Sequence, residues 1–292
     1  MSIYVLQSFL DGVLMGGIYA LAALGLSLIF GVLKITNFAH GAMMAVGMYT
    51  VYALAVGLGI GPYAALPLAV VFMFAIGFGV QRFLINSIDH APAHNQLLLT
   101  LGIAYILENV LLMIFTPNYR TLTVEGFEKA IHIGPLTVAP AKLIMFGVVL
   151  VITAGVYILL YQTRVGRSIR ASAQDEEGAR LMGIHVRRIR AAAFGLGAVC
   201  TGIAGGLLTP VMSIYPTLGE SFQLKCFVIA VLGGMGNLWG AFVSGLLIGV
   251  IESLSGYWLG GTWSEMLIYG AFILILLVRP TGIFGRGNRR EN

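Results

Sequence analysis

Apolar runs long enough to cross a membrane occupy most of this 292-residue chain. About 20 consecutive apolar residues cross a hydrocarbon core of roughly 30 Å as a helix. Hydrophobic residues supply 58% of the chain and charged residues only 10%, whereas a soluble domain carries roughly 25% charged residues. We therefore expect one integral membrane domain over residues 1–292, with too little polar chain left for a soluble catalytic domain.

Polar breaks divide the apolar sequence into eight or nine expected helices. These cover residues 9–33, 42–58, 63–80, 96–115, 142–161, 191–208, 221–232, 239–254 and 264–278. Residues 116–140 are polar and interrupted by Pro and Gly, and the alternation around His132 and Leu136 predicts a short hairpin. The predicted fold is an all-α polytopic bundle of about eight transmembrane helices, some of them broken at glycines. The side on which the N-terminus lies stays open, because a re-entrant break would change the number of crossings.

The longest polar segment between apolar runs, residues 164–190, holds seven arginines against three acidic residues, a net charge of 7 − 3 = +4. Lys and Arg resist transfer across the membrane, so a basic loop of this kind belongs on the cytoplasmic side. The C-terminus is expected on the same side because of Arg279 and the tail residues Arg286, Arg289 and Arg290. Such loops account for the net charge of +5, so nucleic-acid binding has little support.

Two glycine-containing polar breaks occupy similar places in the two halves of the chain, at residues 37–41 and 233–237. Transporters built from repeated halves place substrate sites at such breaks near the bilayer midplane, where water or solute satisfies the unwound backbone. The alternative is that both breaks are helix-end turns at the membrane face, with His40 simply packed at a helix start. On the first interpretation, the residues expected to line a solute pathway are Asn37, His40, Gly41, Glu108, Gly233, Gly234, Gly236 and Asn237.

Glu108 and Glu252 are ionisable residues inside apolar runs. Ionisable groups in such places are costly and usually face the bundle interior or a wet cavity. The two carboxylates fit a solute path or a proton relay, and they fit pairing between helices equally well. For Asp11, Lys34 and Lys225, which lie nearer to helix ends, a further possibility is that the charged head reaches the membrane surface.

The sequence contains no pattern typical of an enzyme. It lacks the G-x-x-x-x-G-K-[ST] loop that cradles ATP, and its five histidines are scattered without metal-ligand spacing. Cys200 and Cys226 lack the paired spacing of a disulfide framework or a zinc site. Ser255 has no evident base partner for nucleophilic catalysis. We therefore expect no catalytic residue, no metal site and no cofactor bound by this chain.

Five short motifs occur in order along the chain. They read ITNFAHG, GRSIRA, ARLMGI, VLGGMGN and RPTGIFG, at residues 35–41, 166–171, 179–184, 231–237 and 279–285. Together they resemble the permease family of branched-chain amino acid ABC importers, specifically its smaller, LivH-type subunit. One motif alone is weak, but five in this order are specific, and the resemblance covers essentially the whole chain.

The resemblance implies a multi-pass protein of the bacterial inner membrane, embedded in the lipid bilayer, that moves a leucine-, isoleucine- or valine-like amino acid. It also implies three kinds of protein partner. A second, related permease would complete the pathway, and two ATPase subunits would bind the ATP and Mg²⁺ that this chain does not bind. A periplasmic solute-binding protein would deliver the solute.

Residues 173–183 are expected to form a helix that serves no apolar span, which predicts contact with another protein. Within it, Glu177-Gly178-Ala179-x-x-x-Gly183 resembles the E-A-A-x-x-x-G coupling motif of ABC importer permeases, with Gly178 replacing the middle Ala and the later I-x-L-P part absent. A short helix ended by Gly suits a cleft on an ATPase, and the alternative is an amphipathic helix resting on the membrane. The implied coupling residues are Glu177, Gly178, Ala179, Arg180, Leu181, Met182 and Gly183.

Two other functions stay open. A permease of the same family for urea or a short amide is hard to separate by sequence, because solute choice rests largely with the binding protein. A stand-alone secondary transporter would carry coupled protons on Glu108 or Glu252 and would need no ATPase. Whether the chain pairs with a different permease or with a second copy of itself is also open.

Overall fold

The computed structural model describes residues 2–88, 91–124, 130–279 and 282–285. The tail arginines Arg286, Arg289 and Arg290 lie outside these ranges, as do residues 280 and 281 of the last motif. Within the described ranges, eight helices are long and apolar enough to cross a membrane, which confirms the predicted all-α polytopic fold. They are α1 (Ser2–Leu33), α2 (His40–Leu58), α3 (Pro62–Gly79) with its continuation, α4 (Ala93–Phe115), α5 (Pro140–Gln162), α8 (Val186–Leu208), α10 (Leu238–Leu259) and α11 (Gly261–Val278).

Shorter elements connect these helices. The continuation of α3 is the π-helical turn η1 (Val80–Leu84) and the 3₁₀ turn η2 (Ile85–Ile88), and the polar loop after α5 forms α6 (Arg164–Gln174) and α7 (Glu176–Leu181). The predicted hairpin is confirmed as the antiparallel pair β1 (Ile131–Ile133) and β2 (Leu136–Val138), in which Ile131 faces Val138. The remaining expected segment, residues 221–232, corresponds to α9 (Leu218–Leu232). Its 15 residues extend about 22 Å at 1.5 Å per residue, less than the hydrocarbon thickness.

Proline and glycine set several helix ends where the sequence predicts them. Pro62 and Pro140 occupy the first turns of α3 and α5, where a missing backbone N–H costs nothing. Gly59 ends α2 with φ at +64°, a left-handed conformation that glycine adopts without a steric penalty. For α2, α3 and α5, the observed bounds therefore fall within two residues of the expected ones.

The centre of the bundle is formed by α1 and α8, whose most apolar stretches are 83% and 89% buried. Glycines let the backbones of neighbouring helices approach closely, as small residues commonly do in membranes. A Cβ added at Gly249 of α10 would lie 2.3 Å from Gly16 Cα of α1, and one added at Gly245 would lie 2.3 Å from Ala20 Cα. The outermost helices, α4 and α11, instead direct most of their apolar side chains outward.

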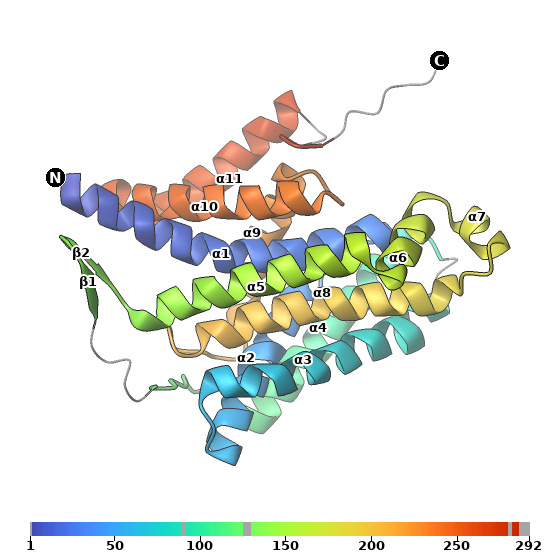
Figure 1. Cartoon of the computed structure of the whole chain (residues 1–292), viewed down its shortest axis with the longest axis horizontal. Helices are drawn as coiled ribbons and strands as arrows, with labels where there is room; N and C mark the ends of the chain where they lie inside the picture. Colours follow the sequence, from blue (N-terminus) through green and yellow to red (C-terminus); the bar gives the residue numbers. More distant parts are fainter. Residues whose placement is uncertain (1, 89–90, 125–129, 280–281, 286–292) are drawn as a thin grey trace.

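The hairpin and α7 lie at opposite ends of the bundle, as Figure 1 shows. Near the start of α1, Gln7 exchanges two hydrogen bonds with Thr137 of β2: its Nε2 donates to Thr137 O at 2.8 Å and its Oε1 accepts from Thr137 N at 3.0 Å. The start of α1 is therefore on the side opposite to the basic loop, residues 164–190.

The end of α11 lies on the same side as the basic loop. Residues 282–285 pack onto the turn between α9 and α10, where Ile283 N donates to Leu232 O at 2.8 Å. The turn between α9 and α10 also contacts α1 near its end, since a Cβ added at Gly31 would lie 3.1 Å from Gly236 Cα. The start of α1 and the end of α11 thus lie on opposite sides of the bundle.

Replacing Gly249 by Ala should lower the stability of the chain, because the added methyl collides with the backbone of α1. Overpacking of this kind costs about 1–3 kcal/mol. The matched control is Gly270→Ala in α11, where an added Cβ meets nothing within 4 Å and the better helix propensity of Ala favours folding by up to about 1 kcal/mol. Thermal unfolding of the purified proteins measures both. Equal melting temperatures would contradict the glycine contact between α1 and α10.

Candidate functional site

The early break, residues 34–39, leads the chain from the end of α1 back into the bundle. Lys34 adopts φ of +56°, and Asn37 Oδ1 accepts a hydrogen bond from Ala39 N at 3.0 Å, a turn that asparagine side chains stabilise. Asn37 is 1% exposed and His40, the first residue of α2, is fully buried. Polar side chains and non-helical backbone thus meet inside an otherwise apolar bundle.

Gln223 of α9 holds this break in place. Its Nε2 donates to Asn37 O at 3.3 Å, and its Oε1 accepts from Gly41 N at 2.6 Å. Two backbone groups outside the regular helical bonding therefore find a partner within the protein. At the same point α2 and α9 touch, since a Cβ added at Gly41 would lie 2.3 Å from Gly219 O. Sequence reasoning missed Gln223 because its partners lie 186 and 182 residues away in the chain.

His40 is packed between three helices. Its Nε2 lies 2.9 Å from Ala22 O of α1, and its backbone O accepts from Thr201 Oγ1 of α8 at 3.5 Å. The ring also lies beside Gly25, where an added Cβ would be 3.3 Å from His40 Cε1. The side chain therefore holds helices together and does not line the cavity described next. A role for His40 in a pathway stays a prediction.

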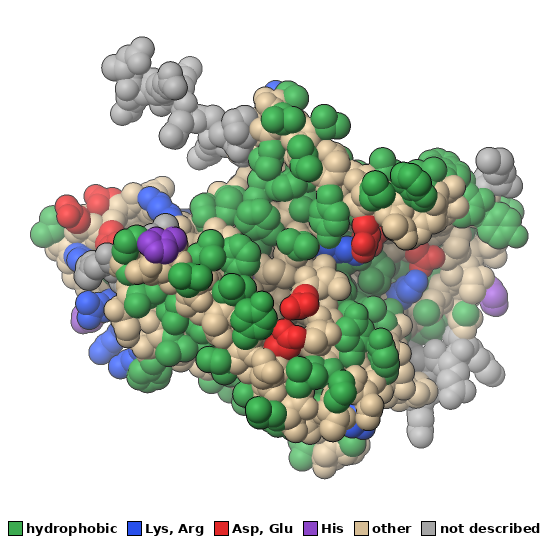
Figure 2. All heavy atoms as spheres, turned by 180° about the vertical axis from the view of Figure 1, so that it is seen from behind, with side chains coloured by type: hydrophobic (Ala, Val, Ile, Leu, Met, Phe, Trp, Pro, Cys, Tyr) green, Lys and Arg blue, Asp and Glu red, His purple; other side chains and the backbone are tan. Residues whose placement is uncertain are grey.

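A cavity of about 290 Å³ lies beside the early break, between α2, α4 and α9. Its polar lining residues are Tyr105, Glu108, Glu220 and Gln223, and its apolar lining includes Phe38, Ala42, Leu101 and Leu224. Figure 2 shows acidic side chains gathered in the middle of a face that is otherwise largely hydrophobic. The cavity therefore combines negative charge and an amide with an apolar wall.

Of the predicted pathway residues, Glu108 lines this cavity. Glu220 joins it there but was not among the predicted residues. The expected helix starts at residue 221, whereas α9 starts at Leu218, which places Glu220 in its first turn. An acidic residue in a first turn complements the helix dipole, and that signal would have moved the expected helix start.

The late break, residues 233–237, lies away from this cavity. Gly234 and Gly236 adopt φ of +80° and +89°, and Gly236 N donates to Ser27 Oγ of α1 at 3.1 Å. Asn237 caps α10, with its Oδ1 accepting from Gly240 N at 3.2 Å, while its Nδ2 donates to Phe284 O at 3.0 Å. The break joins α9, α10, α1 and residues 282–285. Gly233, Gly234, Gly236 and Asn237 remain pathway residues by prediction only.

Several charged residues inside the apolar helices are paired within the described part of the chain, in contrast to Glu108. Lys225 Nζ of α9 lies 2.6 Å from Glu252 Oε1 of α10 and 3.8 Å from Glu265 Oε1 of α11. Lys142 Nζ lies 2.5 Å from Asp11 Oδ1. For Glu252 and Asp11, the structure thus supplies the pairing between helices that the sequence offered as one alternative. Buried charges persist when they are paired and hydrogen-bonded.

The basic loop forms two helices where one was predicted. The expectation of a continuous helix over residues 173–183 is wrong, because Asp175 has an extended backbone and its side chain accepts from Gly178 N at 3.0 Å. This cap starts α7 and ends the preceding α6. Gly183, with φ at +79°, stops α7, and Ile184 N donates to Ala179 O at 3.0 Å just beyond it. The predicted glycine stop is present, but the helix before it is shorter.

The predicted coupling residues are all found on or just after α7, which projects at one end of the bundle (Figure 1). Ala179 faces inward at 4% exposure, whereas Leu181 and Met182 are 88% and 83% exposed. Behind them, Glu176 pairs with Arg180 and lies 2.5 Å from Arg190 Nη2 of α8. Leu181 and Met182 thus place two adjacent apolar side chains on the exposed surface of an otherwise polar segment.

A bundle of membrane-crossing helices, with buried unwound backbone beside a polar cavity and a projecting helix at one end, is an arrangement found in membrane transport proteins. The family described as "Branched-chain amino acid transport system / permease component" matches residues 8–277. The chain therefore belongs to this family of transport permeases.

Relatives along the whole chain agree with this assignment. The chain is 30% identical to the high-affinity branched-chain amino acid transport system permease protein LivH of Salmonella typhimurium and 29% identical to that of Escherichia coli K12, over 97% of this chain and 96% of each relative. It is also 25% identical to the permease protein LivM of the Escherichia coli system, over 91% of this chain and 67% of LivM.

Replacing Gln223 by Leu should destabilise the protein by about 1–3 kcal/mol, because Asn37 O and Gly41 N would lose their buried partner. The matched control is Gln162→Leu at the exposed end of α5. Thermal unfolding and protease resistance of the early break report the effect. If the Gln223→Leu variant were as stable and as resistant to protease as the control, the two hydrogen bonds of Gln223 would contribute nothing to stability.

Proposed function

We propose that this chain forms one half of the translocation pathway of an ATP-driven importer of branched-chain amino acids. The observation that carries the ATP-driven part is α7, a capped six-residue helix outside the apolar spans that exposes Leu181 and Met182. Such a helix suits a cleft on an ATPase surface. Two ATPase subunits would bind the ATP and Mg²⁺ and would hydrolyse the ATP, and this chain would take no part in hydrolysis.

The proposed location is the bacterial inner membrane, with the basic loop in the cytoplasm. Seven arginines in residues 164–190 favour this orientation by the bias of basic loops toward the cytoplasm. Because the start of α1 lies on the opposite side of the bundle, the N-terminus is then periplasmic. The end of α11 is cytoplasmic on the same argument.

The proposed solute site is the cavity that contains Glu108, Glu220 and Gln223. An amino acid carries an ammonium group that carboxylates attract, and a branched aliphatic side chain that Phe38 and Leu224 would contact. A ligand site of this kind combines a mostly apolar wall with a few polar groups. A periplasmic binding protein would deliver the solute from the hairpin side of the bundle.

A second permease is proposed to cover this cavity. Carboxylates facing lipid are expensive, yet acidic side chains sit on a largely hydrophobic face of this chain (Figure 2). A related subunit packed against α4 and α9 would shield Glu108 and Glu220 from lipid and complete the pathway. Similarity to both LivH and LivM supports a related partner, although a second copy of this chain would satisfy the same physical need.

The proposed movement passes from α7 to the early break through α8. Glu176 of α7 pairs with Arg190 of α8, and Thr201 of α8 donates to His40 O at the start of α2. Displacement of α7 by closing ATPases would therefore shift α8 against α2, beside the cavity. Rigid movement of packed helices is a common way to switch a transporter between its two openings.

A substitution at Gly183 tests whether α7 couples this chain to an ATPase. Replacing Gly183 by Val forces a β-branched residue into a left-handed conformation with φ at +79°, a strain of about 1–3 kcal/mol that should unfold the short α7. Transport and co-purification of the ATPase should be lost, while membrane insertion and the melting temperature stay unchanged. The control is Gly155→Val in α5, where an added Cβ has open space. Normal uptake by Gly183→Val would remove the coupling assignment.

A substitution at Glu108 tests the proposed solute site. Uptake measurements on the same protein separate the importer from the two alternative transporters. Replacing Glu108 by Gln should raise the KM for leucine uptake about tenfold, which corresponds to about 1.4 kcal/mol of lost attraction. The control is Asn109→Gln, one position along α4 on its exposed side. An unchanged KM would remove Glu108 from the pathway. Uptake that an uncoupler abolishes and an inactive ATPase leaves intact would favour the proton-coupled transporter, and preference for urea would favour the amide permease.

A further inference from the structure

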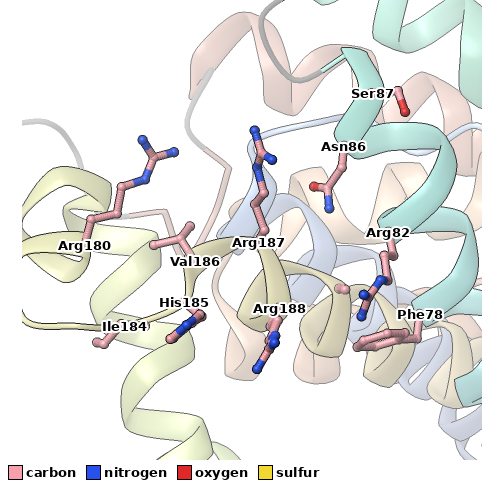
Figure 3. A pocket seen from close by; sticks show the side chains of 11 residues that line it. Phe78, Arg82, Asn86, Ser87, Arg180, Ile184, His185, Val186, Arg187 and Arg188 are labelled. Atoms are coloured by element: carbon pink, nitrogen blue, oxygen red, sulfur yellow. The ribbon is translucent and has the colours of Figure 1, made fainter.

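A second, larger cavity lies at the end of the bundle that carries α7. It encloses about 770 Å³ and is lined by residues of the α3 end, α7 and the start of α8. Four of its lining residues are arginines, namely Arg82, Arg180, Arg187 and Arg188, and none of its described lining residues is acidic. Figure 3 shows Arg82 and Phe78 on one side of the cavity, Arg187 and Arg188 at the start of α8, and Arg180 on the far side.

The four arginines differ in whether their charge is paired within the part of the chain that the structure describes. Arg180 pairs with Glu176, but Arg82, Arg187 and Arg188 form no ion pair with any residue that the structure describes, and all three are exposed. Arg82 instead lies over the rings of Phe78 and Phe83, at 6.0 and 5.9 Å from their centroids. Like charges gathered around one cavity repel, so an anion bound among them would be stabilised by each.

Neutral donors and a helix end add to this charge. Asn86 uses its Oδ1 to accept from Gln81 Nε2 at 3.2 Å, which leaves its own amide N–H groups for a ligand in the cavity it lines. Arg187 and Arg188 lie in the first turn of the 23-residue α8, whose N-terminal end carries partial positive charge. Planar arginines with such neighbours suit the oxygens of a phosphate group.

The cavity adjoins the apolar outer face of the bundle. Phe83 and Leu84 in η1 are 71% and 43% exposed, and α3, which leads into them, is only 28% buried over its most apolar stretch. A molecule with a phosphate in the cavity would thus place apolar chains along α3. Basic pockets between membrane helices bind anionic headgroups in this manner.

We propose that this cavity binds the phosphate of an anionic phospholipid headgroup, with the acyl chains lying along α3. The site is built by residues of η1, α7 and α8, so an occupied cavity joins the projecting helix to the membrane end of α3. The proposal concerns lipid and does not depend on which solute is transported.

The test measures lipid binding to the full chain purified in detergent. Native mass spectrometry during titration with phosphatidylglycerol or with phosphatidylcholine of the same acyl length gives the dissociation constant for each. We expect the wild-type chain to bind phosphatidylglycerol at least tenfold more tightly than phosphatidylcholine. Arg82→Gln/Arg188→Gln should abolish this preference. The control Arg164→Gln/Arg167→Gln removes the same charge from exposed positions on α6 and should retain it.

Other results would overturn the proposal. If the pocket variant keeps the full preference, the cavity is not the site. If inorganic phosphate binds at the cavity but phosphatidylglycerol shows no preference over phosphatidylcholine, the ligand is a soluble anion. If the pocket variant keeps its lipid preference and loses its ATPase, the arginines contact a protein. The variant Arg82→Lys/Arg188→Lys keeps the charge and should keep most of the preference, which guards against a folding defect in the glutamine variant.

Discussion

Every backbone polar group inside a membrane needs a partner, and this requirement determines how the two helix breaks are built. At the early break, the side chains of Asn37 and Gln223 bond to backbone groups that regular helices leave open. At the late break, Ser27 and Asn237 do the same. These side chains bring α1, α2, α9 and α10 together at fixed points. The position of the cavity beside residue 38 follows from them.

Close contact between helix backbones is the second feature that determines how the helices pack. Gly41 meets Gly219, and Gly47 of α2 meets Gly202 of α8, where an added Cβ would lie 2.2 Å from Gly202 O. Because the helices touch at these glycines, the side chains around them are short of space and the interior is nearly filled. The cavities described above therefore occur at the margins of the bundle, where partner subunits or lipids have access.

The sequence predicts the helices well and the contacts between them poorly. Apolar runs, with Pro at helix starts and Gly at helix ends, were enough to predict α2, α3 and α5. The alternation around His132 and Leu136 predicted the hairpin. The cap by Asp175 is a local signal, and attention to it would have given the start of α7. In contrast, the ion pair of Lys225 with Glu252 and the hydrogen bonds of Gln223 to the early break join parts of the chain that are distant in sequence. Hydrophobic pattern carries no information on such contacts, so only Glu108 among the four polar residues that line the cavity was predicted.

The packing of residues 282–285 onto the turn between α9 and α10 has a consequence for how the protein is made. Asn237 bonds to Phe284 O and Leu232 O receives Ile283 N, so this turn is completed only by residues translated about 50 positions later in a chain inserted from its N-terminus. The late break is therefore among the last parts of the bundle to reach its final form, and until α11 is inserted Leu232 O and Asn237 Nδ2 lack these two partners.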